Sequence, residues 1–381
     1  QKSAYEISLG LVGSEMCIRD SYHLARRGLK VLGIDRFTPG HDRGSSHGDT
    51  RIIRMAYFEH PDYVPLLERA HQLWDQLEDT RSERLRFETG LLQAGPAGGF
   101  IVDGVLRSAR EHSLEVEELE AASAQKRFPG FRLADSMTTV YEKQAGYLLV
   151  ENCVKAHAAE AVAQGARLEA GVSITGWRER DGEIIVTTDR GSFRAANLIL
   201  TPGPWAPGLL DKLRIPLEVR QKHLYWFRCP EKRYRDSAGF PSFVFETPNG
   251  FFYGFPSIDG ENIKVARHSG GQQVTDPLDI CRDLEEEDLA SVRGFLGSYL
   301  PGVEEELTRH EVCFYSCTAD EHFILGSHPE CQRVVFAAGL SGHGFKFTSV
   351  QGEMLACMCA GEDHGLSASF LDAGREGLSA G

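Results

Sequence analysis

The sequence lacks the long apolar runs and the basic clusters that define several classes of protein. No apolar stretch approaches the roughly 20 residues that a membrane span needs, and the N-terminus has no basic region followed by a long apolar run. No run of lysine and arginine offsets the formal net charge of −14, which repels the phosphate backbone of nucleic acids. We therefore expect no membrane span, no nucleic-acid partner and a cytoplasmic location.

Cysteine pairs at the spacing of metal or redox sites are also absent. The nine cysteines are scattered along the chain, and no Cys-x-x-Cys motif occurs. A zinc site or a disulfide framework is therefore not expected, and we assign no metal ligands. Most of these thiols should be small, buried core residues.

The glycine fingerprint of a dinucleotide-binding fold is missing near the N-terminus. Residues 29–35 form a short apolar run that ends in Asp35, and the segment before it reads as the end of a helix closed by glycine. In a βαβ unit an acid at this place holds the adenosine ribose through its hydroxyls. The G-x-G-x-x-G turn should lie about 20 residues earlier, but Gly10 and Gly13 have the wrong spacing. We interpret residues 1–21 as linker or adapter sequence joined to the native chain.

Short alternating segments in the middle of the chain predict two sheets. Residues 167–203 have the pattern of a β-meander that returns to a central sheet, and strand-like runs between 221 and 268 suggest a second, mainly antiparallel sheet. Residues 283–300 have the apolar spacing of a helix with an acidic first turn. A chain of 381 residues is expected to form two domains, and the lack of a long linker indicates that they interleave.

A glycine-rich turn lies between a predicted strand and a predicted helix near the C-terminus. The strand covers residues 333–338, the helix covers residues 348–360, and three glycines lie within residues 339–344. Backbone N–H groups and the helix dipole at such a junction attract negative charge, and glycine lets a planar ligand come close. An ordinary tight turn explains the pattern equally well. Lys346 favours a functional turn, because it adds a fixed charge for a carboxylate or a reduced flavin.

Two further segments carry cations suited to an anion. Arg51 and Arg54 are three residues apart and are expected to share one face of a helix. They indicate an anionic partner, although two surface salt bridges explain them slightly better. Lys264 and His268 are four residues apart in an alternating strand, so they share a face. Because burying a lysine is costly, we expect Lys264 either at a solvated sheet edge, the commoner case, or in a site that uses its charge.

Several segments together resemble one family, the monomeric sarcosine oxidases and the closely similar N-methyl-L-tryptophan oxidases. The matching stretches keep the family's order and nearly its spacing, and they are GSSHGDTRIIR (44–54), YVPLLERA (63–70), TPNGFFYGFPS (247–257), IKVARH (263–268), EVCFYS (311–316), DEHFI (320–324) and SGHGFKF (341–347). The likeness extends from residue 22 to residue 360.

The resemblance implies an α/β (α+β) fold with two interleaved domains. One is a Rossmann-like FAD-binding domain of the glutathione-reductase type, and the other is a substrate domain with a mainly antiparallel β-sheet. We assign residues 1–85, 145–220 and 320–381 to the FAD-binding domain and residues 86–144 and 221–319 to the substrate domain.

The resemblance also implies a covalent cofactor. The sulfur of Cys313 would join the 8α-methyl carbon of the flavin ring, and Asp35 would bind the adenosine ribose. Further residues would surround the FAD, and they are Arg36, Ser45, His47, Thr50, Arg51, Trp205, Gly342, Gly344 and Lys346.

The substrate residues follow from the same resemblance. Arg54 and Lys346 would grip a substrate carboxylate through charge-assisted pairs. Lys264 is similar to the family's oxygen-activating lysine. A preorganised cation at this place would lower the barrier to O2 reduction, which develops negative charge. The remaining catalytic residues would line the flavin or shape the pocket around the N-methyl group, and they are Arg51, Tyr253, His268 and Tyr315.

The implied reaction is the flavin-dependent oxidation of a small, sarcosine-like N-methyl amino acid by a monomeric enzyme. The imine product would give formaldehyde and the demethylated amino acid, and O2 would become H2O2. Alternatives are an oxidase of N-methyl-L-tryptophan or of another secondary amino acid, a dehydrogenase with a partner as acceptor, and a non-catalytic chain disabled by its N-terminus.

Two features depart from the family pattern. Ser46 stands where relatives often have a second histidine, and the missing glycine turn removes the expected pyrophosphate site. Cys317 follows Cys313 by four residues, and we assign it no role.

Overall fold

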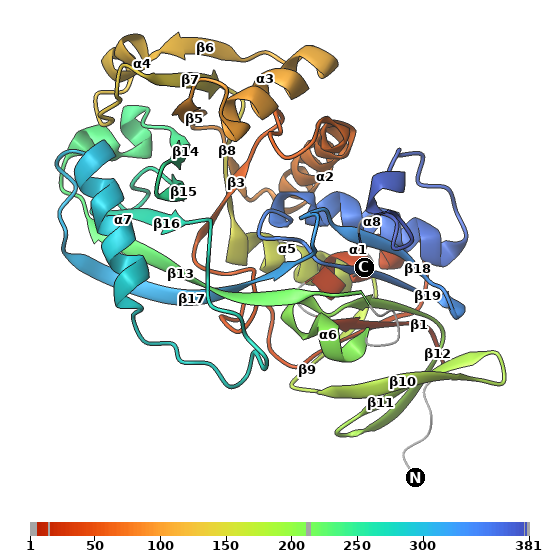
Figure 1. Cartoon of the computed structure of the whole chain (residues 1–381). Helices are drawn as coiled ribbons and strands as arrows, with labels where there is room; N and C mark the ends of the chain where they lie inside the picture. The colour runs from red at the N-terminus through yellow and green to blue at the C-terminus, as the bar shows by residue number, and fades with distance from the viewer. Residues whose placement is uncertain (1–5, 14–15, 211–214, 377, 379–381) are drawn as a thin grey trace.

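The computed structural model describes residues 6–13, 16–210, 215–376 and 378. These residues build two large sheets and a small one (Figure 1). Within them, no helix combines the length and the apolar character that crossing a bilayer requires.

The first large sheet has parallel strands at its centre. Its strands are β1 (Glu6–Gly13), β2 (Val31–Asp35), β9 (Arg167–Ala170), β10 (Ile174–Arg180), β11 (Glu183–Thr188), β12 (Gly191–Thr201), β18 (Ile324–His328) and β19 (Cys331–Ala338). β12 pairs in parallel with β1 and β19, and β2 pairs in parallel with β1 and β9. The antiparallel strands β10 and β11 extend the sheet from β12, and β18 pairs with β19.

Helices cover one face of this sheet (Figure 1). α1 (Met16–Arg26) contacts both α5 (Val150–Ala163) and α8 (Thr348–Ala360), and α2 (Val64–Arg81) packs on α8. Leu24, Val154 and Leu355 are completely buried in this layer. Burial of each such side chain stabilises the fold by about 1.5–3 kcal/mol.

The second large sheet is antiparallel except for one pair. Its strands, in spatial order, are β17 (Leu307–Cys317), β13 (Glu218–Arg228), β16 (Asn262–Arg267), β15 (Gly250–Gly254), β14 (Ser242–Thr247), β5 (Leu91–Pro96), β7 (Met137–Glu142) and β6 (Glu117–Glu120). Only β14 and β5 pair in parallel within this described sheet. The helices α3 (Phe100–His112), α4 (Ala121–Arg127) and α7 (Glu286–Tyr299) accompany it.

The two faces of the second sheet have different environments. Phe243, Phe245 and Phe252 pack with Phe295 of α7 in an aromatic core, and the ring centroids of Phe252 and Phe295 are 4.7 Å apart. Because side chains alternate along a strand, the neighbouring residues point to the opposite face, where Tyr253 lies in another cluster. This second face carries the candidate site.

The small sheet and several short helices connect these layers. The strands are β3 (Thr50–Ile53), β4 (Arg86–Phe87) and β8 (Gly146–Leu149). The short helices are α6 (Ala206–Leu209), η1 (Pro61–Tyr63), η2 (Gly203–Trp205), η4 (Lys232–Tyr234), η5 (Asp236–Ala238), η6 (Phe345–Phe347) and η7 (Ser369–Leu371).

Most predicted elements are confirmed. The mixed α/β class is confirmed, as are the meander within residues 167–203, the antiparallel strands between 221 and 268 and the helix at 348–360. The helix expected from residue 283 begins at Glu286. The assignment of domain boundaries, including the separation of residues 1–21, stays a prediction.

The expected helix that carries Arg51 and Arg54 is wrong. Residues 50–53 form β3, which pairs antiparallel with β8, so Arg51 lies in a strand and Arg54 directly follows it. The reason is local: Ile52 and Ile53 are β-branched and favour a strand, whereas the spacing of two charges alone does not select a helix.

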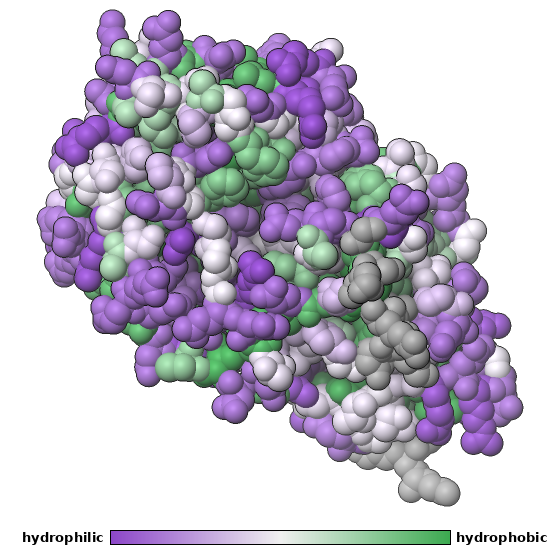
Figure 2. All heavy atoms as spheres, in the orientation of Figure 1, coloured by the Kyte–Doolittle hydropathy of each residue, from purple (hydrophilic) through white to green (hydrophobic). Residues whose placement is uncertain are grey.

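The outer surface is predominantly polar on the face that Figure 2 shows, with apolar residues in small groups. Phe100, at the start of α3, is one of the half-exposed large apolar residues. Its ring stacks on Phe251, with 6.1 Å between the ring centroids.

Candidate active site

A cavity lies where the second sheet meets the C-terminal ends of the central strands of the first. Its walls include Gly203 after β12, Gly339 after β19, and Tyr253 and Tyr315 from the second sheet. Nine predicted site residues line it, and they are Ser45, Arg51, Arg54, Tyr253, His268, Tyr315, Gly342, Gly344 and Lys346. The remaining predicted residues lie outside this lining, and they are Asp35, Arg36, His47, Thr50, Trp205, Lys264 and Cys313.

The glycine-rich turn packs closely against Tyr315. Gly342 has φ +79°, and a Cβ atom there would lie 2.4 Å from the Tyr315 ring. Only glycine permits both the backbone conformation and this approach. The turn therefore holds the Tyr315 ring beside the cavity and brings Lys346 to its wall.

Two cations and one carboxylate gather at the end of the cavity near β3. Arg54 Nη2 lies 2.5 Å from Glu59 Oε2, and its guanidinium lies 4.1 Å from the centre of the Phe58 ring. Lys346 Nζ donates to the carbonyl oxygen of His343 at 2.7 Å. Burial, followed by the charge of Arg54, lowers the pKa of Lys346 to about 7. The cluster has one more cation than anion, so it can accept an anionic ligand.

Arg51 fixes the loop that precedes β3. Its guanidinium donates to the carbonyl oxygens of Thr50 and Ser45 at 2.9 and 2.8 Å. Arg51 also lines the cavity. Arg51 thus combines a structural clamp with a positive charge at the cavity wall.

Lys264 lies behind the cavity wall and is only 4% exposed. Its ammonium donates to the carbonyl oxygens of Gly48 and Thr50 and lies 4.9 Å from the centre of the Phe255 ring. Burial, followed by the charge of Arg51, lowers its pKa to about 7. The solvated sheet edge, the commoner expectation, is wrong for this residue, because β16 is an inner strand.

Cys313 is buried on the same face of the second sheet. Its side chain clusters with Leu224 and Trp226, and its backbone pairs with Lys222 in β13. Burial raises the pKa of the thiol, while the charges of Arg51, Lys264 and Lys222 lower it. The net pKa stays raised, so these three cations offset the effect of burial only in part.

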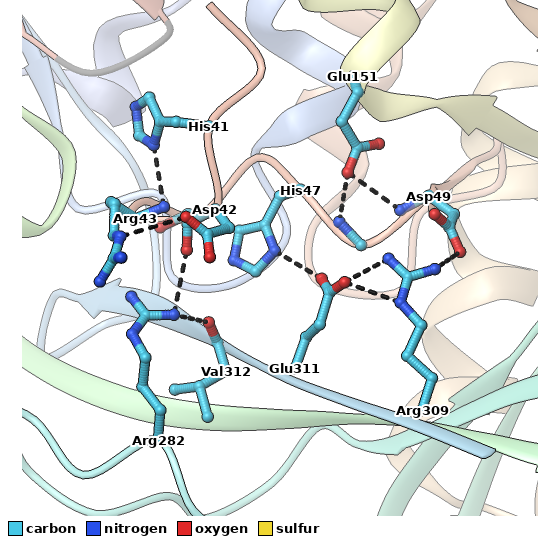
Figure 3. Close-up of polar contacts among 12 residues, drawn as sticks. His41, Asp42, Arg43, His47, Asp49, Glu151, Arg282, Arg309, Glu311 and Val312 are labelled. Atoms are coloured by element: carbon cyan, nitrogen blue, oxygen red, sulfur yellow. Dashed lines mark hydrogen bonds and ion pairs between the residues drawn. The ribbon is translucent and has the colours of Figure 1, made fainter. Parts of the chain in front are cut away.

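A network that the sequence analysis missed holds His47 (Figure 3). His47 Nδ1 lies 2.9 Å from Glu311 Oε2, and Arg309 bridges Glu311 and Asp49. Although burial opposes it, hydrogen bonds from His47 and Arg309 lower the pKa of Glu311 to about 2. One signal was available: Glu311 precedes Cys313 by two residues and so shares its strand face.

The same loop is fixed from its other side by Glu151 at the start of α5. Glu151 Oε1 accepts hydrogen bonds from the backbone N–H groups of Gly48 and Asp49, at 2.7 and 3.3 Å. His47 Nε2 is buried and has no hydrogen-bond partner among the described residues. A ligand acceptor can satisfy this atom.

Asp35, Arg36 and Trp205 gather away from the cavity, at the end of β2. Asp35 Oδ1 accepts the backbone N–H of Phe37 at 2.8 Å, and burial raises the pKa of this carboxyl to about 7. The Arg36 guanidinium lies 5.9 Å from the centre of the Trp205 ring. Trp205 Nε1 is buried without a partner in the part of the chain that the structure describes.

These residues fit FAD at two ends. Trp205 Nε1 is a buried donor, and His47 Nε2 is a buried donor or acceptor, and neither has a hydrogen-bond partner among the described residues. The buried acid Asp35 at the end of β2 suits ribose hydroxyls. The missing glycine turn was expected within residues 10–17, where Gly10 and Gly13 lie in β1 and residues 14–15 lie outside the described residues. The loss of the pyrophosphate site therefore stays a prediction.

Comparison with known proteins identifies the class of enzyme to which this chain belongs. Residues 21–358 match the family of FAD dependent oxidoreductases called DAO, and the chain belongs to this family. It is a FAD-dependent amine oxidoreductase that acts on CH–NH donors.

Individual relatives narrow the likeness further. The chain is 40% identical over 361 residues to the monomeric sarcosine oxidase of Arthrobacter sp. (strain TE1826), covering 93% of this chain and 92% of that protein. It is 36% identical over 352 residues to the N-methyl-L-tryptophan oxidase of Yersinia pestis (strain Pestoides F), with 92% of each chain covered.

Solved structures agree in fold. NikD, an unusual amino acid oxidase essential for nikkomycin biosynthesis, superposes with a TM-score of 0.84 at 25% identity, over 96% of this chain and 97% of NikD. L-proline dehydrogenase from P. horikoshii superposes with a TM-score of 0.85 at 20% identity, over 97% and 98% of the two chains.

Proposed function

We propose that this enzyme oxidises a small N-methyl amino acid of the sarcosine type, with FAD attached to Cys313 and O2 as electron acceptor. The imine product reacts with water to give formaldehyde and the demethylated amino acid, and O2 becomes H2O2. The observation that supports an amino acid most directly is the pair of cations, Arg54 and Lys346, beside the single carboxylate of Glu59.

In this proposal Arg54 and Lys346 bind the substrate carboxylate. A carboxylate that enters the cavity forms charge-assisted hydrogen bonds with both cations and competes with Glu59 for Arg54. Fixing the carboxylate at one end of the cavity directs the amine toward the opposite wall, so orientation contributes to the rate.

His268 and Tyr315 also line the cavity, and we propose that they hold the amine. Burial, followed by the charge of Lys222, lowers the pKa of His268 to about 3, so the imidazole is neutral near pH 7. Its Nδ1 lies 3.2 Å from the hydroxyl oxygen of Tyr315. A neutral imidazole does not repel a protonated amine and can accept a hydrogen bond from it.

Lys264 has a separate role in the proposal. When bound, the flavin accepts two electrons from the substrate and passes them to O2. Reduction of O2 develops negative charge, and the Lys264 ammonium, held by backbone carbonyl groups, stabilises that charge without reorganisation.

A secondary amino acid with a large apolar side chain, such as N-methyl-L-tryptophan, is the second candidate substrate. Phe58, Val244 and Phe251 give the cavity an apolar wall, and Phe100 extends it to the surface. Such a wall adds contact area for a large side chain and adds little for sarcosine.

We also propose that the enzyme is a monomer that works in the cytoplasm. The names of the sarcosine oxidase relatives support the first point. The second is supported by the free thiols of the eight described cysteines, since a reducing compartment preserves thiols.

Acid denaturation and a peroxide assay test the function together. We expect the yellow colour to stay with the acid precipitate, and H2O2 to form with sarcosine. Colour in the supernatant would refute the bond to Cys313. Peroxide with N-methyl-L-tryptophan but not with sarcosine would select the second candidate, and no peroxide with any N-methyl amino acid would end the proposal.

A further inference from the structure

A third buried lysine, Lys222, shares the site-facing side of the second sheet. It lies in β13 directly opposite Cys313 in the strand ladder, and it is 3% exposed. Its ammonium lies 5.4 Å from the centre of the Tyr315 ring. No motif marks it in the sequence, where it stands in the polar stretch 220–223 before the apolar residues 224–227.

The ammonium of Lys222 binds the backbone just after β16. Its Nζ donates to the carbonyl oxygens of Ser269 and Gly270, at 2.9 and 3.1 Å. No carboxylate of the described residues lies within ion-pair distance of this nitrogen. Burial lowers the pKa of Lys222 to about 8, so the charge is still present near neutral pH.

The chain after His268 is shaped to wrap around this lysine. Gly271 has φ +108°, and a Cβ there would lie 3.0 Å from Lys222 Cδ and 2.5 Å from the carbonyl oxygen of Gln221. Ser269 Oγ accepts the backbone N–H of Phe251 at 3.0 Å, and the His268 N–H donates to the Phe251 carbonyl at 2.7 Å. The backbone of His268 is thus held between β15 and the Lys222 ammonium.

Lys222 therefore reaches the cavity through two residues that line it. It anchors the backbone next to His268, and its charge lies beside the Tyr315 ring, whose hydroxyl oxygen is 3.2 Å from His268 Nδ1. Other titratable or charged groups also act on His268 from the surrounding elements, and they are Arg54, Glu59, Tyr253, Tyr315 and His343. Of the charges acting on His268, that of Lys222 has the largest effect on its pKa.

We propose that Lys222 is a positioning residue of the substrate pocket: its ammonium fixes His268 and Tyr315 against the cavity. The inference rests on the proposed function in one respect, namely that this cavity receives the substrate amine. The ammonium does not touch the cavity itself, so its effect passes through the two aromatic residues.

Two substitutions separate the charge of Lys222 from its hydrogen bonds. Lys222→Gln removes the charge and keeps a shorter donor, whereas Lys222→Met removes both. Lys143→Met, in the exposed turn between β7 and β8, is the matched control. Histidine NMR on the apoprotein, with His268→Asn to assign the resonance, reports the titration of His268 without any need for activity.

We expect the titration midpoint of His268 to rise by roughly one pH unit in both Lys222 variants and to stay unchanged in Lys143→Met. In the flavin-loaded enzyme, Lys222→Met should raise KM about 10-fold with a smaller change in kcat, because the amine wall is misplaced. Lys222→Gln should give a smaller rise in KM. If Lys222→Met does not fold, Lys222→Gln carries the test.

An unchanged His268 midpoint together with the KM of the Lys143→Met control would overturn the proposal and reduce Lys222 to a core residue. Failure of the proposed function has a different signature, since the unsubstituted enzyme would then form no peroxide with any N-methyl amino acid. The apoprotein titration remains decisive for Lys222 in that case.

Discussion

The two ends of the cofactor site differ in how they accommodate buried charge. At the flavin end, the Lys264 and Lys346 ammonium groups each bind backbone carbonyl groups, and Arg54 pairs with Glu59. Near the first βα unit, α1 buries Arg19 and Asp20 completely. Burial raises the pKa of Asp20 well above its ordinary value, although Arg19 and Thr201 oppose the shift.

This difference indicates which buried charges belong to a functional site and which do not. Cations at the flavin end have acceptors that come from several distant segments, as a selected site requires. In α1, burial raises the pKa of the Asp20 carboxyl, so an uncharged residue would cost less at that position. This contrast, and a family match that begins at residue 21, support our proposal that residues 1–21 are not native.

The proposed covalent bond between FAD and Cys313 should give the largest effect at the flavin end. Cys313→Ala should abolish the colour retained by the acid precipitate, because no other thiol would react with the flavin. Cys317→Ala, on the same strand, is the control and should retain the colour. Absorbance of the redissolved precipitate near the flavin maximum decides the point, and colour retained in Cys313→Ala would move the attachment elsewhere.

Replacing Lys264 tests whether a buried cation at this end serves oxygen. Lys264→Met should slow the reaction of reduced enzyme with O2 by about 100-fold or more, and anaerobic reduction by substrate should change little. Stopped-flow measurement of the two half-reactions separates the effects. A variant that is reduced slowly and reoxidised normally contradicts the role.

Replacing Lys346 should give a smaller effect on catalysis and should change how KM depends on pH. Lys346→Met should lower kcat/KM by about 10- to 100-fold, as expected for the loss of a hydrogen bond between charged groups. Because its pKa is lowered to about 7, the free enzyme loses this positive charge as pH rises above 7, so KM should increase there. The rise should be absent in Lys346→Met and present in Lys143→Met. An identical pH profile in both variants would remove Lys346 from the substrate site.

Replacing Asp20 should give the smallest effect, and it tests the buried charges of α1. Its folded-state pKa is raised, so the charged form destabilises the fold at neutral pH, and the penalty vanishes below about pH 4, where both states are protonated. Asp20→Ala should therefore raise Tm by about 2 °C at pH 7 and leave it nearly unchanged at pH 4. Asp363→Ala, at an exposed position, is the control. A lower Tm at pH 7 would indicate a selected charge in α1.

Local patterns allowed much of the fold to be predicted. The strand that ends at Asp35 and the helix at 348–360 follow from apolar spacing and glycine boundaries, so the structure agrees with them. The helix expected at Arg51 and Arg54 failed because a charge pair has no periodicity, whereas pairing with β8 is a long-range contact.

The candidate site was only partly accessible from sequence. Lys264 and Lys346 were found through motifs, and the structure brings both close to Arg51. The Glu311 network and Lys222 were missed, because their partners come from segments that lie far apart in the chain. Hydrogen-bond partners across such separations cannot be matched from local sequence, although the place of Glu311 two residues before Cys313 was a signal for that residue.

The order of strands in the first sheet affects how the protein is made. β12 lies between β1 and β19, and β19 ends at residue 338 of 381. During translation the central layer is therefore incomplete until residue 338 has left the ribosome, and the cofactor has no complete binding surface before then.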